Sequence, residues 1–302
     1  MTGTSSALDL FRLDGRVALI TGGAGLLGQR YCEALVQAGA HVAIGDLDAD
    51  RARALAAELN ATGATADPAS TADGVEHQPS PPRALGLCLD VTNQESVRQT
   101  VAAVVEAFGR LDILINNAAL TVRGGSERLQ PADYFAPFEA YKLEVWDQAL
   151  RTNLTGMLLC AQAAGQQMLI QTPPGGVIVN ISSTYGVVAP DQRLYDGVTS
   201  PYAETGFNTP VSYAVTKTAV LGLTRYLATY WGSKHIRVNA LTPHGVFDNH
   251  DDAFVRNFVY RSPLGRMARN DEYRGALLFL VSDASSYMTG ANLIVDGGWT
   301  AW

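Results

Sequence analysis

Cysteine is scarce in the sequence and is not arranged for disulfides or for metal binding. Cys32, Cys88 and Cys160 are odd in number and form no C-x-x-C pair, and the five histidines never approach a spacing such as H-x-x-x-H. Disulfide frameworks and structural zinc sites need such pairs. We therefore expect no metal site and a reduced, cytoplasmic compartment.

Long apolar runs, blocks of basic charge and a leader-like N-terminus are also lacking. No apolar run reaches the roughly 18 residues of a membrane span, and residues 1–9 contain neither a basic n-region nor an apolar h-region. The net charge of -7 comes with no basic block, which argues against nucleic acid and anionic membranes as partners. We expect a soluble protein whose partner is a small molecule.

Apolar runs alternate with amphipathic segments along the 302 residues, 47% of which are hydrophobic. The pattern predicts strands at about 16–20, 41–45, 85–89, 111–115, 176–181, 237–241 and 292–295, and helices at about 29–38, 49–59, 94–108, 143–170, 213–231 and 272–281. Such alternation predicts an α/β fold with a doubly wound parallel sheet. No stretch resembles an interdomain linker, so residues 1–302 are expected to form a single domain with insertions at about 60–84 and 187–210.

A glycine-rich turn at residues 21–28 lies between the first predicted strand and the first predicted helix. Glycines let the backbone approach a pyrophosphate, whose charge meets the N-terminus of the following helix. Asp46 ends the second strand, where a carboxylate can bind a ribose diol and repel a 2′-phosphate. No Arg or Lys lies at 21–28 or 41–46, so NAD is favoured over NADP. The alternatives are a turn without a ligand, and an Asp46 that caps the helix beginning near Asp48.

Tyr213 and Lys217 are four residues apart on a predicted helix, so they lie on one face of it. A phenol keeps its proton to about pH 10, and an ammonium group one turn away favours the phenolate. The pair predicts a catalytic acid/base, although the same spacing also occurs by chance on solvated helices. Ser183 follows the fifth strand, at the sheet edge where ligands bind in open α/β folds. Asn153 lies inside a predicted helix, where Asn has no advantage and is either tolerated or used.

In their order and spacing these motifs resemble those of short-chain dehydrogenases/reductases, over about residues 14–300. The matching motifs are Thr21–Gly28, Asp90-Val91, Asn116-Asn117-Ala118, Asn153, Ser183, Tyr213 with Lys217, Asn239 with Pro243, and Asp296-Gly297-Gly298. The resemblance implies a seven-stranded, mostly parallel Rossmann-type sheet with helices on both faces, and an NAD(P)-dependent oxidoreductase acting on CH–OH groups. It also implies a homotetramer or homodimer, held partly by the helices that follow Asn153 and Tyr213.

The resemblance further implies roles for individual residues. Tyr213 would exchange a proton with the substrate, Lys217 would lower its pKa and bind the nicotinamide ribose, and Ser183 would hydrogen-bond the reacting oxygen. Asn153 would break its helix locally and hold a water that links Lys217 to solvent. The implied cofactor-binding residues are Gly22, Gly25, Leu26, Leu27, Gly28, Asp46, Leu47, Asp90 (adenine), Val91, Asn117 (ribose), Ala118, Ala119, Tyr213, Lys217, Pro243 and Val246 (nicotinamide amide).

The sequence departs from the family pattern at several positions. Leu26 stands where the middle glycine of T-G-x-x-x-G-x-G belongs, and the resulting T-G-x-x-G-x-x-G is similar to sugar-nucleotide epimerases and dehydratases. Only about 85 residues follow Lys217, too few for the substrate domain of that branch. Ala119, His244 and Asp248 also replace usual residues. A non-catalytic NAD-binding sensor is a further alternative. Such a protein would be expected to lose Tyr213 or Lys217, and both are present here.

Thirty residues separate Ser183 from Tyr213, against about a dozen in many relatives. Because both ends of the 187–210 insertion lie next to the predicted chemistry, we hypothesise that it covers the substrate. Its aromatic and polar side chains favour a sugar- or polyol-like ligand, and weakly resemble a branch assigned to flagellin or surface-glycan modification. The alternative is a surface or subunit-contact insertion. The insertion includes Asp191, Gln192, Arg193, Leu194, Tyr195, Asp196, Tyr202 and Glu204.

Overall fold

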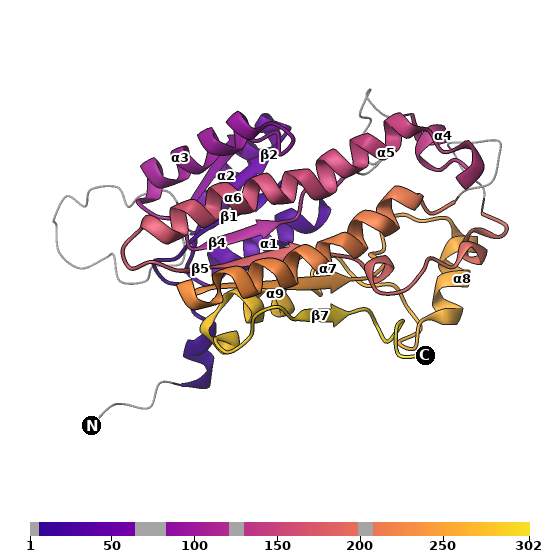
Figure 1. The fold of residues 1–302 in the computed structure, drawn as a ribbon. Coiled ribbons are helices and arrows are strands. Elements are labelled where there is room, and N and C mark those ends of the chain that lie inside the picture. The colour runs from indigo at the N-terminus through magenta and orange to yellow at the C-terminus, as the bar shows by residue number, and fades with distance from the viewer. Residues whose placement is uncertain (1–5, 64–82, 121–129, 199–207) are drawn as a thin grey trace.

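Seven parallel strands form one sheet in the order β3-β2-β1-β4-β5-β6-β7 (Figure 1). The computed structural model describes residues 6–63, 83–120, 130–198 and 208–302. The strands are β1 (Val17–Thr21), β2 (His41–Asp46), β3 (Ala84–Cys88), β4 (Ile113–Asn116), β5 (Gly176–Ile181), β6 (Ile236–Pro243) and β7 (Asn292–Val295). Because the order runs outward in both directions from the β1–β4 pair, the predicted doubly wound sheet is confirmed, and its ladders are all parallel.

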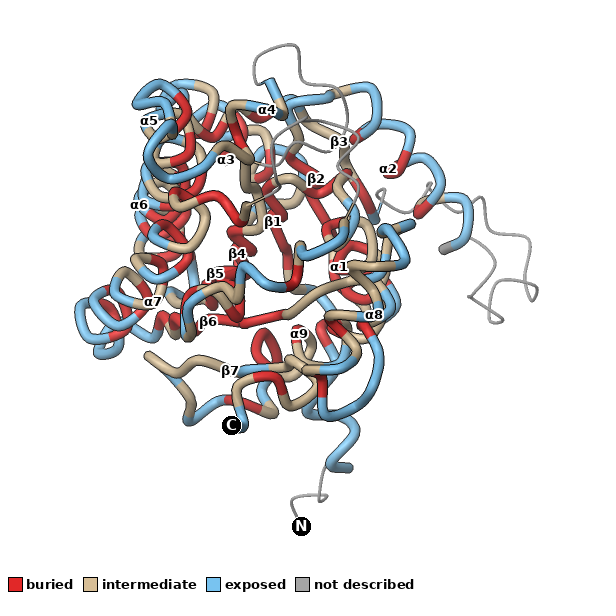
Figure 2. Tube along the Cα trace, turned by 90° about the vertical axis from the view of Figure 1, so that its right-hand side faces the viewer, coloured by how far each residue is buried: buried red, intermediate tan, exposed pale blue. Residues whose placement is uncertain are grey.

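Helices cover both faces of this sheet, as Figures 1 and 2 show. One face packs against α1 (Leu26–Gln37), α2 (Ala49–Gly63) and α9 (Arg274–Val281), and the other against α3 (Gln94–Phe108), α6 (Gly156–Ile170) and α7 (Val211–Trp231). Strands covered on both faces must be apolar on both. In β1, Ala18 and Ile20 join the first core while Val17 and Leu19 join the second. Each large aliphatic side chain buried in this way contributes about 1.5–3 kcal/mol.

The helix predicted at 143–170 is not continuous. It consists of α5 (Leu143–Leu150), a π-helical turn at Arg151–Thr155, and α6. Asn153 lies in the π-helical turn, so the local break that the resemblance implied at this residue is confirmed. Such a turn widens the helix by one residue and often marks a functional position.

A helix that the sequence reading left out, α8 (Asp252–Arg261), lies beyond the carboxyl end of the sheet together with the short α4 (Pro131–Tyr134) (right in Figure 1). Asp251 caps it by accepting hydrogen bonds from the N–H groups of Ala253 and Phe254. The signals were present in the sequence as a capping Asp followed by apolar residues at helical spacing. No helix or strand was predicted between residues 241 and 272.

The two predicted insertions differ in how much of them the structure describes. The helix α2 extends to Gly63 rather than ending near residue 59, and residues 64–82 lie outside the described part. Of the 187–210 insertion, residues 187–198 and 208–210 are described and include a 3-10 turn, η5 (Gln192–Tyr195). Tyr202 and Glu204 lie outside the described residues.

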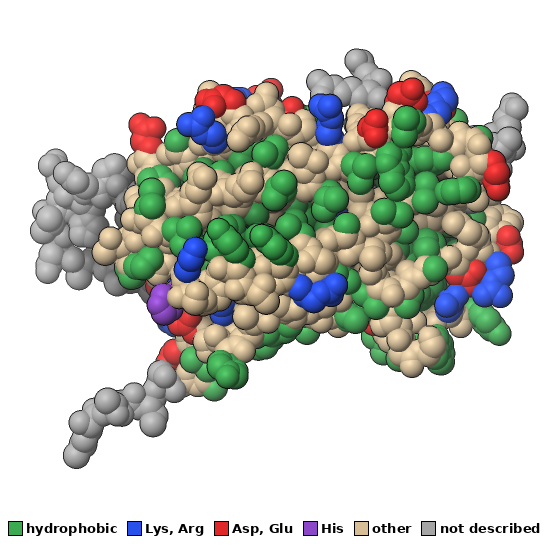
Figure 3. Space-filling view, in the orientation of Figure 1, with side chains coloured by type: hydrophobic (Ala, Val, Ile, Leu, Met, Phe, Trp, Pro, Cys, Tyr) green, Lys and Arg blue, Asp and Glu red, His purple; other side chains and the backbone are tan. Residues whose placement is uncertain are grey.

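The outer surface of α6 and α7 carries exposed hydrophobic side chains, and Figure 3 shows hydrophobic side chains gathered over this part of the molecule. They include Leu158, Val215, Tyr226 and Tyr230. None of the helices in the described ranges is both long and apolar enough to cross a bilayer.

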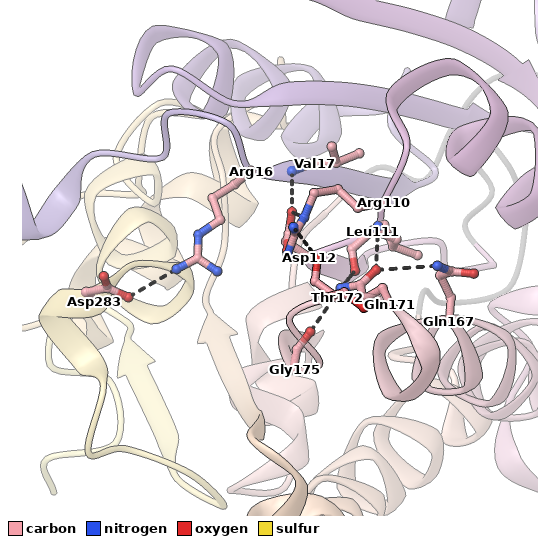
Figure 4. A network of polar contacts seen from close by, with 10 residues as sticks. All are labelled: Arg16, Val17, Arg110, Leu111, Asp112, Gln167, Gln171, Thr172, Gly175 and Asp283. Carbon is pink, nitrogen blue, oxygen red and sulfur yellow. Dashed lines mark hydrogen bonds and ion pairs between the residues drawn. The ribbon is translucent and has the colours of Figure 1, made fainter.

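A buried carboxylate fastens the amino-terminal ends of β1 and β4 (Figure 4). Asp112 is 1% exposed in its side chain and accepts a hydrogen bond from the Val17 N–H at 3.0 Å. The Arg110 guanidinium donates to both of its oxygens, at 2.7–3.0 Å. Nearby, Gln171 donates to the carbonyl groups of Leu111 and Gly175. This network holds the sheet edge opposite to the one that carries the polar motifs.

Replacing Asp112 by Ala should lower the free energy of unfolding by about 2–3 kcal/mol, because the Arg110 guanidinium and the Val17 N–H lose their acceptor. Asp283→Ala is the matched control, since the Asp283 carboxylate is 71% exposed and lies 3.5 Å from Arg16. Its effect should stay below about 0.5 kcal/mol. Urea denaturation measures both values, and similar losses in the two variants would contradict the role given to Asp112.

Candidate active site

The turn between β1 and α1 brings backbone groups to a cleft at the carboxyl end of the sheet. Gly22 has a φ of 60°, and a Cβ on Gly28 would lie 2.3 Å from the Gly22 carbonyl oxygen. Any side chain at residue 28 would therefore push α1 away from the turn. Gly25 precedes α1 without a side-chain cap, which leaves the first N–H groups of the helix without intrahelical partners. These residues fit the pyrophosphate of a dinucleotide, which such a helix N-terminus attracts.

Asp46 lies beside this turn, at the end of β2. Its Oδ2 accepts a hydrogen bond from the Ala24 N–H at 3.0 Å, and its Oδ1 accepts one from the Asp48 N–H at 3.1 Å. The carboxylate that caps α2 belongs to Asp48, which accepts from the Arg51 N–H. The alternative reading of Asp46 as the cap of α2 is therefore wrong. Each carboxylate oxygen of Asp46 still has a second lone pair for a ligand.

A cation lies next to the Asp46 carboxylate, contrary to the expectation from the sequence. The Arg51 guanidinium donates from Nη2 to the Ala24 carbonyl oxygen at 2.9 Å, and Arg51, Asp46 and the glycine turn line the same cleft. Arg51 lies five residues beyond Asp46. It is therefore outside residues 21–28 and 41–46, whose lack of Arg and Lys was the reason to favour NAD. The first turn of α2 brings it back to the glycine loop.

The ends of β3 and β4 supply the next predicted residues. The Asp90 carboxylate accepts two hydrogen bonds from Thr92, one from its N–H and one from its hydroxyl. The Asn117 side-chain amide donates to the carbonyl groups of Thr21 and Gly22 at 3.1 and 2.9 Å. Asn117 therefore stabilises the glycine turn directly, and its Oδ1 is left for a ligand.

Tyr213 and Lys217 lie one turn apart near the start of α7, with the Lys217 Nζ 5.7 Å from the centre of the Tyr213 ring. Lys217 is 2% exposed, and its ammonium donates to the Ile181 carbonyl oxygen at 2.8 Å. Ser183 follows β5, and its hydroxyl accepts from the Tyr185 N–H. The three side chains from β5 and α7 thus meet at one edge of the sheet.

The electrostatics of this group differ from the simple expectation for an isolated pair. Burial raises the pKa of Tyr213 above the usual value of a phenol, and the hydrogen bond with the Ser183 side chain partly offsets this. Burial also lowers the pKa of Lys217 to about 8. In the protein without a ligand, Tyr213 is therefore held as the neutral acid, and Lys217 is close to losing its charge.

Asn153 does not line the cleft but braces it from behind. Its side chain is 1% exposed. The Oδ1 accepts from the Leu120 N–H at 2.7 Å, and the Nδ2 donates to the Thr216 hydroxyl at 3.1 Å. Asn153 therefore joins the loop after β4 to the turn of α7 that carries Tyr213 and Lys217.

The other end of the cleft is largely aromatic. Tyr185 comes from the 3-10 turn η4 (Thr184–Gly186), Tyr195 from η5, and Phe254 and Phe258 from α8. Met267 and His244 also line this end of the cleft. The rings of Tyr195 and Phe254 stack with centroids 5.6 Å apart, and those of His244 and Phe258 with centroids 4.8 Å apart.

One cleft of about 1220 Å³ brings the predicted residues together. Gly28 and Asn153 support it from outside, and the others line it: Gly22, Gly25, Leu26, Leu27, Asp46, Leu47, Asp90, Val91, Asn117, Ala118, Ala119, Ser183, Tyr213, Lys217, Pro243 and Val246. In the described ranges, no three His, Cys, Asp or Glu side chains gather into a group that could hold a metal ion.

Comparison with known proteins agrees with this geometry. Residues 16–78 and 66–195 match the family described as short chain dehydrogenase, and residues 197–300 match one described as enoyl-(acyl carrier protein) reductase. The chain belongs to the short-chain dehydrogenase/reductase family. It is an oxidoreductase that acts on CH–OH groups.

Three similar members of the family show how far the likeness extends along the chain. The chain is 35% identical to the D-threitol dehydrogenase of Mycolicibacterium smegmatis, covering 96% of this chain and 95% of that protein. It is 38% identical to the trans-4-hydroxycyclohexanecarboxylate dehydrogenase of Sinomonas cyclohexanicum, with the same coverage. The crystal structure of a gluconate 5-dehydrogenase from Burkholderia cenocepacia, in complex with NADP and tartrate, is similar with a TM-score of 0.79 and 31% identity, over 98% of this chain and 100% of that one.

Sequence reasoning missed several residues of this short-chain dehydrogenase that line the cleft. Phe254, Phe258 and Met267 follow β6 in a region for which no element was predicted, and His244 was noted only as a departure from the family pattern. The capping Asp251 and the helical spacing of the two phenylalanines could have revealed α8. Nothing in the local pattern shows that α8 reaches Tyr195.

The buried ammonium of Lys217 should make stability depend on pH. Its folded pKa of about 8 lies below the unfolded value of 10.5, so above pH 8 the unfolded chain holds a proton that the folded chain has released. Between pH 8 and about pH 9.5 this group should add to the free energy of unfolding as the pH rises, so the slope of Lys217→Met should be lower than that of the wild type by up to ~1.4 kcal/mol per pH unit. The buried Cys32 and Cys160, whose pKa values are raised by burial, act in the opposite direction, but they do so equally in both proteins. Urea denaturation at several pH values gives the slopes. Lys234→Met, at an exposed lysine beyond α7, should keep the wild-type slope, and equal slopes for wild type and Lys217→Met would refute the explanation.

Proposed function

We propose that this protein is an NAD-dependent oxidoreductase that interconverts a secondary alcohol and a ketone on a small, hydroxylated, sugar- or polyol-like molecule. The observation that carries the proposal is the meeting of Ser183, Tyr213 and Lys217 in the same cleft as an uncapped helix N-terminus. The similar proteins named for threitol, gluconate and a hydroxycyclohexane substrate support an alcohol/ketone reaction.

In the proposed oxidation, Ser183 and Tyr213 bind the substrate hydroxyl, and the Tyr213 phenolate takes its proton. The O–H and C–H bonds of the carbinol break and a C=O bond forms. The two electrons leave with the hydride, for which a nicotinamide held by Lys217 and Val246 would supply the acceptor. In the reverse direction the neutral Tyr213 phenol donates its proton to the carbonyl oxygen. The raised pKa of Tyr213 in the free protein suits this second direction.

Lys217 and Asn153 act around this proton transfer. Lys217 would bind the nicotinamide ribose and, while charged, favour the phenolate of Tyr213. Asn153 would hold a water that links Lys217 to solvent. The π-helical turn supports this role because such a turn leaves backbone carbonyl groups without their usual helical partners.

NAD is proposed over NADP because the Asp46 carboxylate can accept hydrogen bonds from a ribose diol and repels a phosphate. The neighbouring Arg51 weakens that repulsion, since its guanidinium lies within the same part of the cleft. We therefore expect a preference for NAD that is smaller than a lone carboxylate would produce. The similar gluconate 5-dehydrogenase was solved with NADP, which is compatible with a modest preference in such a cleft.

Two alternatives have less support. A sugar-nucleotide epimerase or dehydratase is suggested by the T-G-x-x-G-x-x-G spacing alone, and few residues follow Lys217 for its substrate domain. A non-catalytic NAD sensor does not need the serine, tyrosine and lysine that line this cleft. Turnover of NAD with secondary alcohols separates the oxidoreductase from both.

The insertion is proposed to cover the substrate. Tyr195 of η5 lines the cleft, and the Asn257 amide of α8 donates to the Leu194 and Asp196 carbonyl groups. Asp191, which we expected to face a hydroxylated ligand, instead pairs with Arg193 and Arg261. These contacts favour a cover fixed to α8 over a subunit-contact insertion. Shortening the segment should raise KM without changing the affinity for NAD.

A homodimer or homotetramer remains a prediction, as does the cytoplasmic location. The exposed Leu158, Val215, Tyr226 and Tyr230 on α6 and α7 support an assembly through these helices, and light scattering would measure the mass of the particle.

Tyr213→Phe should lower kcat at least about 100-fold, because the acid/base is lost, while the Kd for NAD changes little. Lys217→Ala should impair both. Tyr141→Phe is the matched control, since the Tyr141 hydroxyl pairs with Ser212 at 2.6 Å beside Tyr213, and it should retain most of the activity. NADH absorbance and NADH fluorescence titration give the two quantities. If Tyr213→Phe keeps more than a few per cent of wild-type turnover, the assignment is wrong.

The double variant Asp46→Ala, Leu47→Arg should shift the ratio of Kd values towards NADP by at least about tenfold, because it removes a charged ribose contact and adds a cation. Arg51→Ala should shift the same ratio in the opposite direction. Arg53→Ala is the control for Arg51, because Arg53 pairs with Asp50 at the surface. Titration with NADH and NADPH measures the ratios. An unchanged ratio in the double variant would mean that Asp46 does not select the cofactor.

A further inference from the structure

At the aromatic end of the cleft, packing and polar contacts hold the side chains in fixed positions. Leu194 of η5 is 3% exposed and packs with Phe258, Met267 and Trp299 in a small core of its own. The ion pair of Asp191 with Arg261 and the Asn257 hydrogen bonds tie η5 to α8. These contacts hold the wall, defined as Tyr185, Tyr195, Phe254, Phe258 and Met267, in the same cleft as Ser183, Tyr213 and Lys217.

The side chains of this wall are mostly aromatic. Tyr195 stacks on Phe254 with an interplanar angle of 26°, and Phe254 stacks on His250 at 19°. Tyr185 meets His244 edge to face, with centroids 5.9 Å apart. Because these rings stack on one another, part of their faces is covered, and what they offer to the cleft is mainly C–H surface with few hydrogen-bond partners.

Among the phenols around Tyr213, Tyr185 alone has a hydroxyl without a hydrogen-bond partner in the described residues. The Tyr134 hydroxyl donates to the Leu120 carbonyl, Tyr141 pairs with Ser212, and Tyr195 pairs with Thr209. Tyr185 lines the cleft and lies near enough to Tyr195 and Tyr213 for their charges to raise its pKa, after the larger effect of burial. Its hydroxyl is therefore the polar group that the wall offers to a ligand.

An open-chain polyol suits this wall poorly. Its hydroxyls point to several sides, and each one pressed against an aromatic face loses water without gaining a partner. A ring-shaped alcohol keeps its C–H groups on the two faces and its hydroxyls at the rim. Such a molecule can lie against the wall and still direct one hydroxyl to Tyr213 and Ser183 and another to Tyr185.

We propose, resting on the oxidoreductase function above, that the substrate is a ring-shaped secondary alcohol, carbocyclic or pyranose, which packs its C–H groups against Tyr195 and Phe254 and presents a second hydroxyl to Tyr185. Phe254 and Tyr185 are therefore specificity residues. Phe254 selects the ring, and Tyr185 selects the second hydroxyl.

The first test compares two vicinal secondary diols that differ in ring closure, trans-cyclohexane-1,2-diol and butane-2,3-diol. The wild type should oxidise the cyclic diol with a KM at least about tenfold lower. Phe254→Leu keeps an apolar side chain but removes the aromatic face, and should shrink this KM ratio severalfold. Tyr260→Leu, at a 93% exposed tyrosine of the same helix, should leave the ratio unchanged. Equal KM values for the two diols in the wild type would overturn the proposal.

The second test concerns Tyr185. Tyr185→Phe should raise the KM for the cyclic diol about threefold to tenfold relative to that for cyclohexanol, which lacks the second hydroxyl. Tyr260→Phe serves as the control that removes a hydroxyl outside the cleft. An unchanged ratio of the two KM values would overturn the role of Tyr185.

Binding without turnover separates this inference from the proposed function. Saturation-transfer difference spectra of the Tyr213→Phe variant with NADH should show the cyclic diol bound more tightly than the open-chain diol. If the cyclic diol binds but the wild type oxidises no alcohol, the proposed function fails and the ring preference stands. If the wild type oxidises open-chain diols and the cyclic diol does not bind, the ring preference fails and the oxidoreductase function stands.

Discussion

The hydrogen bond from the Lys217 ammonium to the Ile181 carbonyl fastens α7 to the end of β5, and the candidate active site depends on it. The Ser182 hydroxyl donates in turn to the Lys217 carbonyl, and Gly186 passes so close that a Cβ there would lie 2.5 Å from the same oxygen. These contacts fix the backbone of α7 next to the segment that follows β5, and the side chains of Ser183 and Tyr213 are thereby brought together. The hydrogen bond to Ile181 places the ammonium in the interior, and this burial lowers the pKa of Lys217.

Backbone groups play the same part at the other end of the cleft. The Thr21 hydroxyl accepts from the N–H groups of Asn117 and Ala118, while Asn117 donates back to the carbonyl groups of Thr21 and Gly22. This reciprocal bonding joins β1 to β4 at the point where the strand order reverses, where open α/β sheets bind their ligands. The glycine turn is thereby held in shape before any dinucleotide is bound, which lowers the entropic cost of binding.

The aromatic end of the cleft differs from the glycine turn, because it is formed by segments that lie between the strands in the sequence. The turn η5 and the helix α8 come from opposite sides of α7 in the sequence, yet they share a core around Leu194, Phe258 and Trp299. The stacked rings of Tyr195 and Phe254, the hydrogen bonds of Asn257 and the ion pair of Asp191 with Arg261 hold them together. Because these segments are separate from the strands and from the glycine turn, a family fold can vary them without changing the residues that carry the chemistry.

The sequence by itself determined the seven strands and their helices, the glycine turn and the one-turn separation of Tyr213 from Lys217. These features depend on periodicities of two and 3.6 residues, and on conformations that only glycine adopts, so they can be read from neighbours along the chain. Even Asn153 could be singled out, because a polar residue without helical advantage stood inside an apolar helix. Only the tertiary structure decided that Arg51 reaches back to Ala24 beside Asp46, that the amide of Asn117 braces the glycine turn, and that Phe254 stacks on Tyr195. Each of these contacts joins residues whose separation in space is set by the path of the whole chain, and burial among distant residues, rather than spacing, sets the pKa values of Tyr213 and Lys217.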